Sequence, residues 1–170
     1  MPRSKRCAPP GPSEVAGLSR RRCLALAAAL PLAARAQETA LPRPASLPAE
    51  AQAAARRGAP LVVLVSLAGC PYCERLRREH LTPMLRESSG GVVQIDLGRT
   101  QALIDFDGRA RSHDAVARTR QALFTPTVLL LGPRGDELAE RLVGAGVPDF
   151  YGAYLEQRIV TARRSLSGAP

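Results

Sequence analysis

The stretch Gly69-Cys70-Pro71-Tyr72-Cys73-Glu74 decides how the chain around it folds. It is preceded by the apolar, β-branched-rich run Leu61–Val65, which is typical of a central strand buried on both faces. Pro71 suits the first turn of a helix, because the N–H that it lacks would have no partner there. The pattern therefore predicts a strand, a short loop and a helix that begins at Cys70. This point is the carboxyl end of the strand, where open α/β sheets place their ligands.

Cys70 and Cys73 are separated by two residues and can close a small disulfide ring. Free amide groups and the dipole at a helix start stabilise a thiolate, so we expect the pKa of Cys70 to lie below the usual value of about 8.5. Cys70 is then the attacking thiol, and Cys73, one turn into the helix and less exposed, is the resolving thiol. A structural disulfide stabilises a fold mainly by closing a long loop, which this spacing does not do. The pair is therefore predicted to be catalytic or metal-binding.

Residues 1–36 have the features of an export signal. The run Ser19-Arg20-Arg21-Arg22-Cys23-Leu24 resembles the twin-arginine signature. The uncharged run 23–34 has twelve residues, fewer than the about 20 that a bilayer-spanning helix needs. Ala34-Arg35-Ala36 has the small-x-small form of a cleavage site, which places the mature start near Gln37 and predicts a periplasmic protein. An uncleaved anchor and a wrongly assigned start codon are the alternatives.

The chain carries a net charge of +9, most of it in residues 1–36, which hold seven basic side chains and one acidic one. Residues 37–170 hold 17 basic and 14 acidic side chains, so the mature protein is only mildly basic. That part has no basic stripe with interleaved aromatic residues, and nucleic-acid binding is not expected. Hydrophobic residues make up 45% of the chain, a normal fraction for a globular domain, which argues against global disorder.

The remaining pattern predicts a linker over residues 37–48, a single α/β domain over residues 49–164 and a tail over residues 165–170. The domain is long enough to bury its own core. Its further predicted elements are helices over 49–57, 113–123 and 148–163, strands over 92–96 and 137–143, a strand headed by Pro126 within residues 124–131, and a hairpin at Asp107-Gly108.

The helix after Cys70 is expected to end near Leu81, with a new turn at Thr82-Pro83. The charged residues between Glu74 and Glu79 are expected to form its outer, solvated face. No function is assigned to them.

Two histidines and two aspartates are further candidates for a metal or acid–base site. The spacing from Cys73 to His80, and then to His113 in another segment, matches no usual zinc pattern. A copper(I) site on the two cysteines, with His80 as a third ligand, is kept as an alternative. Both histidines are otherwise expected at helix surfaces, and Asp105 and Asp107 are expected to support a turn rather than catalysis. No metal or other cofactor is assigned.

A second signal lies far from the cysteines, at Thr125-Pro126, where a proline heads a predicted strand. The order helix, strand, CxxC helix, strand, helix, Thr-Pro strand, strand, helix resembles the thioredoxin fold over about residues 47–163, an α/β fold with a central mixed β-sheet flanked by helices. Gly135, in the turn after the Thr-Pro strand, adds to the match. Cys70-Pro71-Tyr72-Cys73 has the dipeptide of glutaredoxins. The wider pattern is similar to exported thioredoxin-like proteins of bacterial sulfur-oxidation gene clusters, of the SoxW and SoxS kind.

This resemblance implies that Pro126 is cis and lies against the dithiol, and that the backbone of Thr125 pairs with an extended segment of a partner protein. The chain also departs from thioredoxin. Gly69 stands where thioredoxin has a tryptophan, and Leu64 stands where thioredoxin has a buried aspartate that assists proton transfer. Any proton relay therefore uses water or another group.

The sequence thus predicts a thiol–disulfide oxidoreductase that exchanges its Cys70–Cys73 dithiol with thiols and disulfides of partner proteins. The resemblance favours the reductant direction, which in an oxidising periplasm needs a membrane or periplasmic electron donor. A disulfide-forming oxidant, a copper(I) chaperone on the same cysteines and a non-catalytic binding module are the alternatives. No extra dimerisation domain is recognised, so a monomer is expected.

Overall fold

The computed structural model describes residues 40–87, 91–146 and 148–168 of the chain. The predicted export signal and its cleavage site lie outside the described residues, as do residues 37–39 of the predicted linker and residues 169–170 of the predicted tail. Among the described helices, none has both the length and the apolar composition needed to cross a lipid bilayer.

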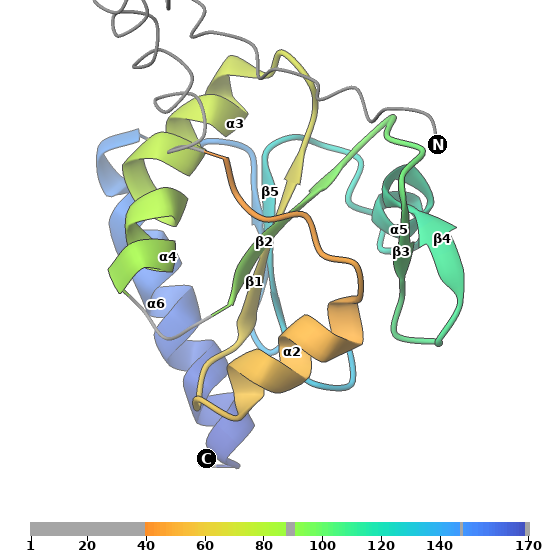
Figure 1. The fold of residues 1–170 in the computed structure, drawn as a ribbon. Coiled ribbons are helices and arrows are strands. Elements are labelled where there is room, and N and C mark those ends of the chain that lie inside the picture. Colours follow the sequence, from red (N-terminus) through yellow and green to blue (C-terminus); the bar gives the residue numbers. More distant parts are fainter. Residues whose placement is uncertain (1–39, 88–90, 147, 169–170) are drawn as a thin grey trace, which may run out of the picture.

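A four-stranded mixed sheet forms the centre of the domain, with its strands in the order β2-β1-β5-β6 (Figure 1). β1 runs parallel to β2 and antiparallel to β5, and β5 runs antiparallel to β6. All of β1 is buried, as a continuous apolar run predicts for a strand covered on both faces. The predicted mixed sheet is therefore confirmed. Its strands are β1 (Leu61–Ser66), β2 (Val92–Asp96), β5 (Thr127–Leu131) and β6 (Leu142–Val143).

Alternate side chains of β1 enter two separate cores, because successive residues of a strand point to opposite faces. Val63 and Val65 pack with α2 and α5 on one face, whereas Val62 and Leu64 pack with α3 and α6 on the other (Figure 1). Burial of each such side chain contributes about 1.5–3 kcal/mol, so the strand that leads to Cys70 is held firmly on both faces. The helices are α2 (Leu47–Ala55), α3 (Pro71–Leu76), α4 (Thr82–Glu87), α5 (His113–Thr119) and α6 (Pro148–Ser167).

The helix that starts after Cys70 continues through a π-helical turn, η1 (Arg77–Leu81), into α4, so the predicted new turn at Thr82-Pro83 is wrong. The Thr82 N–H donates to the carbonyl of Arg77, five residues earlier, which is the widened turn of a π-helix. Pro83 has no N–H to donate, and a proline ring crowds the carbonyl four residues back. The wider turn directly before Pro83 relieves that crowding, and the helix continues.

The residues that lead into α2 pack onto the sheet. Leu41 and Pro44 are buried, and the Gln94 N–H donates to the Pro42 carbonyl at 2.9 Å. The segment therefore meets the free edge of β2 at Pro42, where edge strands in native proteins are usually protected, and then pairs with β3 at Ala45 and Ser46. This part of the predicted linker is extended, but it belongs to the domain, and α2 begins two residues before the predicted start.

The predicted hairpin is present, with β3 (Ala102–Ile104) and β4 (Ala110–Ser112) joined through Asp107-Gly108. Phe106, next to this turn, packs directly over Gly135: a Cβ at Gly135 would lie 2.5 Å from the Phe106 Cγ, and the backbone there has φ +83. Both facts require glycine. Gly135 thus fixes how closely the turn after β5 approaches the hairpin.

The strand predicted over residues 137–143 is formed only at β6, with one isolated bridge at Glu137. Between them the backbone leaves the ladder, because Ala139 turns inward to pack with Ala162 of α6. The Ser165 hydroxyl donates to the Leu138 carbonyl at 3.0 Å, which ties the end of α6 to the same segment. These contacts explain why α6 runs four residues beyond its predicted end and includes Ser165–Ser167 of the predicted tail.

Candidate redox-active site

Cys70 and Cys73 form a disulfide at the start of α3, with their Cα atoms 5.3 Å apart. Cys70 is the N-cap residue of α3, and its Sγ accepts a hydrogen bond from the Cys73 N–H at 3.2 Å. Pro71 occupies the first turn, where its missing N–H costs nothing. When the disulfide is reduced, the same N–H and the helix dipole are in place to stabilise a Cys70 thiolate.

The two sulfurs differ in access. Cys73 is completely buried, whereas Cys70 is partly exposed and the Pro71 and Tyr72 side chains between them point into solvent. Cys70 Sγ is therefore the more accessible of the two sulfurs, and Cys73 Sγ is shielded by the protein.

The Thr125-Pro126 segment meets the disulfide from the other end of the sequence. The Thr125–Pro126 peptide bond is cis, as the resemblance implies, and the Pro126 side chain is buried. The Thr125 hydroxyl lies 3.8 Å from the Cys70 Sγ, although the two residues are 55 positions apart. The structure thus brings together the two motifs that carry the resemblance.

Large apolar side chains surround this junction and are open to solvent. We call them the apolar rim: Leu67, Tyr72, Phe124 and Val143, with exposures of 46%, 61%, 73% and 56%. Leu67 precedes the cysteine loop, Phe124 precedes Thr125, and Val143 pairs with Thr127 at the head of β5. Grouped exposed apolar side chains mark interaction sites. In the sequence, Tyr72 lies within the CxxC motif and Phe124 lies next to Thr125, whereas nothing marks Leu67 or Val143 as part of the rim.

Beneath the dithiol the surroundings are apolar. Leu64 is fully buried and packs in one cluster with Leu76 and Tyr151. The Tyr151 hydroxyl is buried without a hydrogen-bond partner among the described residues, and burial raises the pKa of this phenol far above its ordinary value. The buried acids of the described residues, Asp96 and Asp105, bond instead to Arg43 and Gln94 and to the hairpin backbone. The position that holds a carboxylate in thioredoxin is therefore occupied here by packed hydrocarbon.

A polar network that the sequence analysis missed lies beside the cysteine loop. Arg77, expected on the solvated face, instead donates to Gln94 Oε1 at 3.0 Å and to Ser66 Oγ at 3.3 Å. Gln94 in turn donates to Asp96 at 2.5 Å, and Arg43 donates to the other oxygen of Asp96 at 2.7 Å. The network joins the CxxC helix to β1, β2 and the segment before α2. Its members come from four separate segments, so no local pattern announces it.

The two histidines lie away from the sulfurs. His113 is fully buried, so its predicted surface position is wrong; its Nδ1 accepts the Asp96 N–H at 3.3 Å, and burial lowers the pKa of its imidazole. His80 stacks on Tyr151 of α6, with ring centroids 5.5 Å apart. In the described part of the chain, no three His, Cys, Asp or Glu side chains are grouped as a metal site would need.

The aspartates serve the hairpin, as predicted. Asp105 is buried and its carboxylate accepts the Phe106 N–H at 2.8 Å. Asp107 pairs with Arg111 and also accepts the Arg109 N–H at 3.0 Å, and both contacts lower the pKa of its carboxyl.

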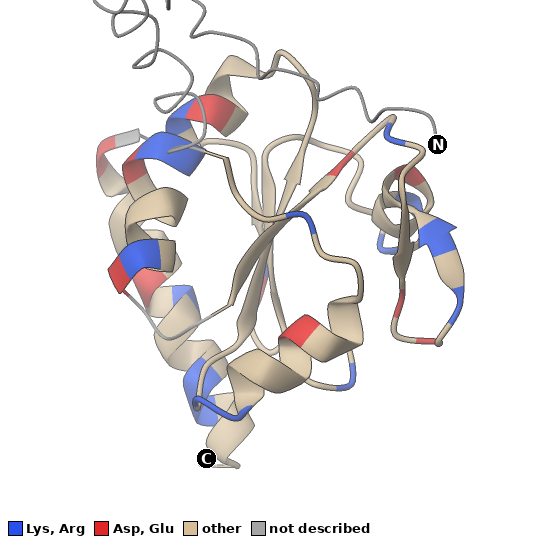
Figure 2. Cartoon of the chain, in the orientation of Figure 1, with Lys and Arg blue, Asp and Glu red and all other residues tan. Residues whose placement is uncertain are grey.

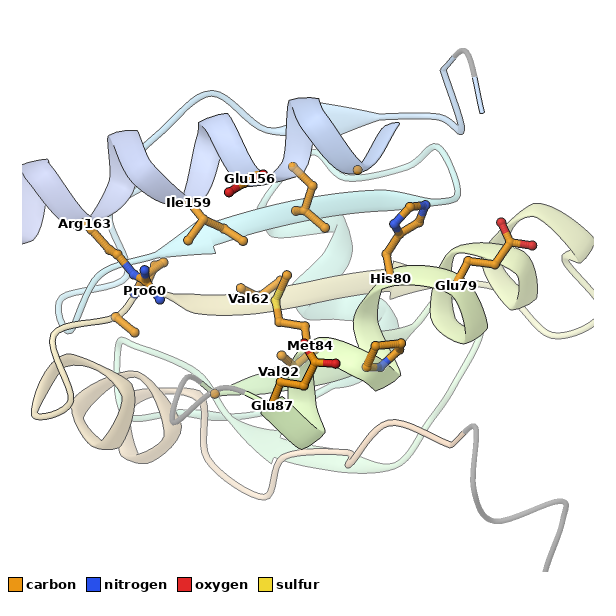
Figure 3. A pocket seen from close by; sticks show the side chains of 15 residues that line it. Pro60, Val62, Glu79, His80, Met84, Glu87, Val92, Glu156, Ile159 and Arg163 are labelled. Atoms are coloured by element: carbon orange, nitrogen blue, oxygen red, sulfur yellow. The ribbon is translucent and has the colours of Figure 1, made fainter. Parts of the chain in front are cut away.

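A hollow of about 440 Å³ opens between α4 and α6 on the face that carries α3 (Figure 3). Its floor is apolar, with Val62, Val92 and Ile159, and its ends are charged. His80 stands at one end and points toward α6 (Figure 3). None of the residues that line this hollow belongs to the CxxC motif or to the Thr125-Pro126 segment.

The mixed sheet, the disulfide at the start of α3 and the cis-proline segment together define a thioredoxin-fold protein with a disulfide-forming cysteine pair. The chain matches the family model of the thioredoxin-like domain over residues 47–159, and it belongs to that family.

Solved structures similar to this chain include two thioredoxin-fold proteins. One is a thioredoxin-fold protein from Helicobacter pylori, with 14% identity over 77% of this chain and 92% of that one, and a TM-score of 0.46. Another is the oxidised form of mitochondrial thioredoxin 3 from Saccharomyces cerevisiae, with 19% identity over 72% of this chain and 96% of that one, and a TM-score of 0.46. A search of curated proteins finds no match.

Proposed function

We propose that this protein is an exported thiol–disulfide oxidoreductase that acts on the cysteines of partner proteins, as a reductant. The observation that carries the proposal is the asymmetric pair: a partly exposed Cys70 at a helix N-terminus, beside the cis-proline segment, with a completely buried Cys73 joined to it. Membership of the thioredoxin-like family supports the same chemistry.

In the reductant direction, the Cys70 thiolate attacks one sulfur of a partner disulfide. A bond forms between Cys70 Sγ and that sulfur, and the second partner sulfur leaves as a thiolate. Cys73 then loses its proton and attacks Cys70 Sγ, which closes the Cys70–Cys73 disulfide and releases the first partner sulfur. Two electrons pass to the partner, and the protons of the two protein thiols end on its thiols. Because the buried Leu64 stands where thioredoxin has a carboxylate, water at the site is the expected proton acceptor for Cys73.

The partner is expected to bind along the Thr125-Pro126 segment. Neither the N–H nor the carbonyl of Thr125 is hydrogen-bonded to another described residue, so both are available to an added strand. The apolar rim around them supplies hydrophobic contact area without fixing a sequence.

The test is to trap the mixed disulfide. In Cys73→Ser the resolving thiol is missing, so partner proteins are expected to accumulate as adducts on Cys70 that a reductant releases. Cys70→Ser is the matched control, and its remaining thiol at Cys73 is buried and is expected to trap nothing. Absence of adducts in Cys73→Ser, or equal adducts in both variants, would contradict the exchange mechanism.

Export is proposed from the predicted export signal in residues 1–36 alone. The SoxW-like character is proposed from the family resemblance alone. The protein recovered from the periplasm is expected to begin near Gln37, and changing both Arg20 and Arg21 to lysine is expected to keep it in the cytoplasm. Full-length chain found only in the cytoplasm would contradict export.

A further inference from the structure

A hollow of about 490 Å³ adjoins the cysteine loop on the side opposite the cis-proline segment. It is lined by the loop residues just before Cys70, including Gly69, and by the CxxC helix, the end of β2 and the segment before α2. Like the dithiol, it sits at the carboxyl ends of β1 and β2, where α/β sheets bind ligands. A group bound there would lie next to the residue that carries the attacking sulfur.

Three guanidinium groups from three different segments line this hollow, which we call the arginine hollow: Arg43, Arg77 and Arg99. Figure 2 shows an acidic position on β2 between a basic position on the segment before α2 and one on the loop after β2, with further basic positions on the CxxC helix. Arg43 is fixed by its 2.7 Å bond to Asp96, and Arg77 by its bonds to Gln94 and Ser66. These two groups are therefore held in place, whereas Arg99 donates to the exposed Gln101 Oε1 at 2.9 Å.

The arginine hollow presents more positive than negative charge to solvent. Asp96, which orients Arg43 and approaches Arg99 at 3.7 Å, has a side chain only 10% exposed, whereas those of Arg43 and Arg99 are 36% and 41% exposed. Glu74, the other acid in the lining, is exposed, so three arginines against two carboxylates leave the lining with a net charge of +1. Fixed arginines favour carboxylates, because the planar guanidinium can donate two parallel hydrogen bonds to one carboxylate.

We propose that the arginine hollow binds a carboxylate of the substrate, so that the protein prefers disulfides with an acidic group close to the reacting cysteine. This proposal rests on the proposed thiol–disulfide exchange and names the substrate class for it. The chemistry fits an acidic residue beside a cysteine of a partner protein, and it also fits a small disulfide that bears carboxylates.

The test compares two peptide disulfides that differ only in the residue beside cysteine, Glu in one and Gln in the other. The reduced full chain is mixed with each, and the second-order rate constant of its oxidation is measured by acid quenching. At low salt the Glu peptide is expected to react about fivefold faster, and the ratio is expected to fall toward one in 0.5 M NaCl.

Arg99→Gln and Arg43→Gln are expected to bring the Glu-to-Gln rate ratio close to one at low salt. Arg99→Gln leaves the Arg43–Asp96 bond intact, so it remains informative if Arg43→Gln is poorly folded. Arg56→Gln removes the same charge from an exposed position at the C-cap of α2, outside the hollow, and it should keep the wild-type ratio. A third measurement uses glutathione disulfide to identify where the carboxylate comes from. If the rate with glutathione disulfide depends on Arg99, the natural ligand is a small disulfide that bears carboxylates. If only the rate with the Glu peptide depends on Arg99, the natural ligand is a partner protein.

The outcomes separate the two proposals. Equal rates for the Glu and Gln peptides in the wild-type protein would overturn the arginine hollow as a substrate site while leaving the exchange reaction intact. Failure of the reduced protein to react with either peptide would overturn the proposed function itself.

Discussion

Replacement of Arg77 by methionine tests whether the polar network anchors the CxxC helix. The change keeps most of the side chain's hydrocarbon and removes two hydrogen bonds, one to Gln94 and one to Ser66. Both partners are nearly inaccessible, with exposures of 3% and 1%. A buried polar group that loses its partner costs about 1–3 kcal/mol. Because water can enter the arginine hollow beside them, the low end applies to each, and the sum is about 2–3 kcal/mol.

The assay is urea and thermal denaturation of the oxidised protein, so that the state of the disulfide is the same in every sample. For a domain of this size the predicted loss lowers the melting temperature by on the order of 10 °C. Arg75→Met is the control, because Arg75 lies on the same helix and makes only an exposed pair with Glu79. If Arg77→Met were no less stable than Arg75→Met, the network would not be holding the helix and the reasoning would fail.

Three further predictions concern the surroundings of the site. Neutral His113 accepts the Asp96 N–H, and burial lowers the pKa of its imidazole, so acid favours the unfolded state. The free energy of unfolding should therefore fall as the pH drops below about 6.5, and it should fall less in His113→Gln. Equal slopes of unfolding free energy against pH in the wild-type protein and in His113→Gln would refute this prediction. Leu64→Asp places a carboxyl in an apolar cluster, where the pKa of that carboxyl must rise. Compared with Leu64→Asn, the Asp variant should lose stability as the pH rises above about 4, by about 1.4 kcal/mol for each unit of pKa rise. Parallel plots of stability against pH for the two variants would refute this prediction. Gly135→Ala should lower the free energy of unfolding by more than about 2 kcal/mol, because the new Cβ clashes with Phe106 and the backbone there has an unfavourable positive φ. At Gly108 an added Cβ meets no atom, so Gly108→Ala should lower the free energy of unfolding less in the same urea titration. Equal losses in the two variants would refute the packing argument.

Elements with a strong local signal were predictable. β2 was predicted with its observed bounds, and β1 to within one residue, because continuous apolar runs are typical of central strands. The start of α3 at the cysteines followed from the position of Pro71. Elements whose conformation depends on contacts with residues distant in sequence were predicted wrongly. The segment 137–143 carries apolar residues that suit a strand, yet Ala139 is drawn out of the ladder by its contact with α6.

The site divides in the same way. Cys70, Cys73 and Thr125-Pro126 were identified from motifs, and the structure brings them together. Arg77 was assigned to a solvated face, since a charged residue between other charged residues gives no sign that its partners lie on two strands. His113 was misplaced for a related reason. Its environment is set by the backbone of Asp96, which is 17 residues away.

The most direct test of the central claim is a redox titration of the protein in glutathione buffers, with free thiols alkylated and counted by mass. We expect Cys70 and Cys73 to gain or lose their thiols together, in one two-electron transition between dithiol and internal disulfide. In the same samples Cys70 should be alkylated with a pKa below about 8.5, and Cys73 should react more slowly because it is buried. Cysteines that stay as thiols in every buffer, or that form only glutathione adducts without the internal disulfide, would contradict the account.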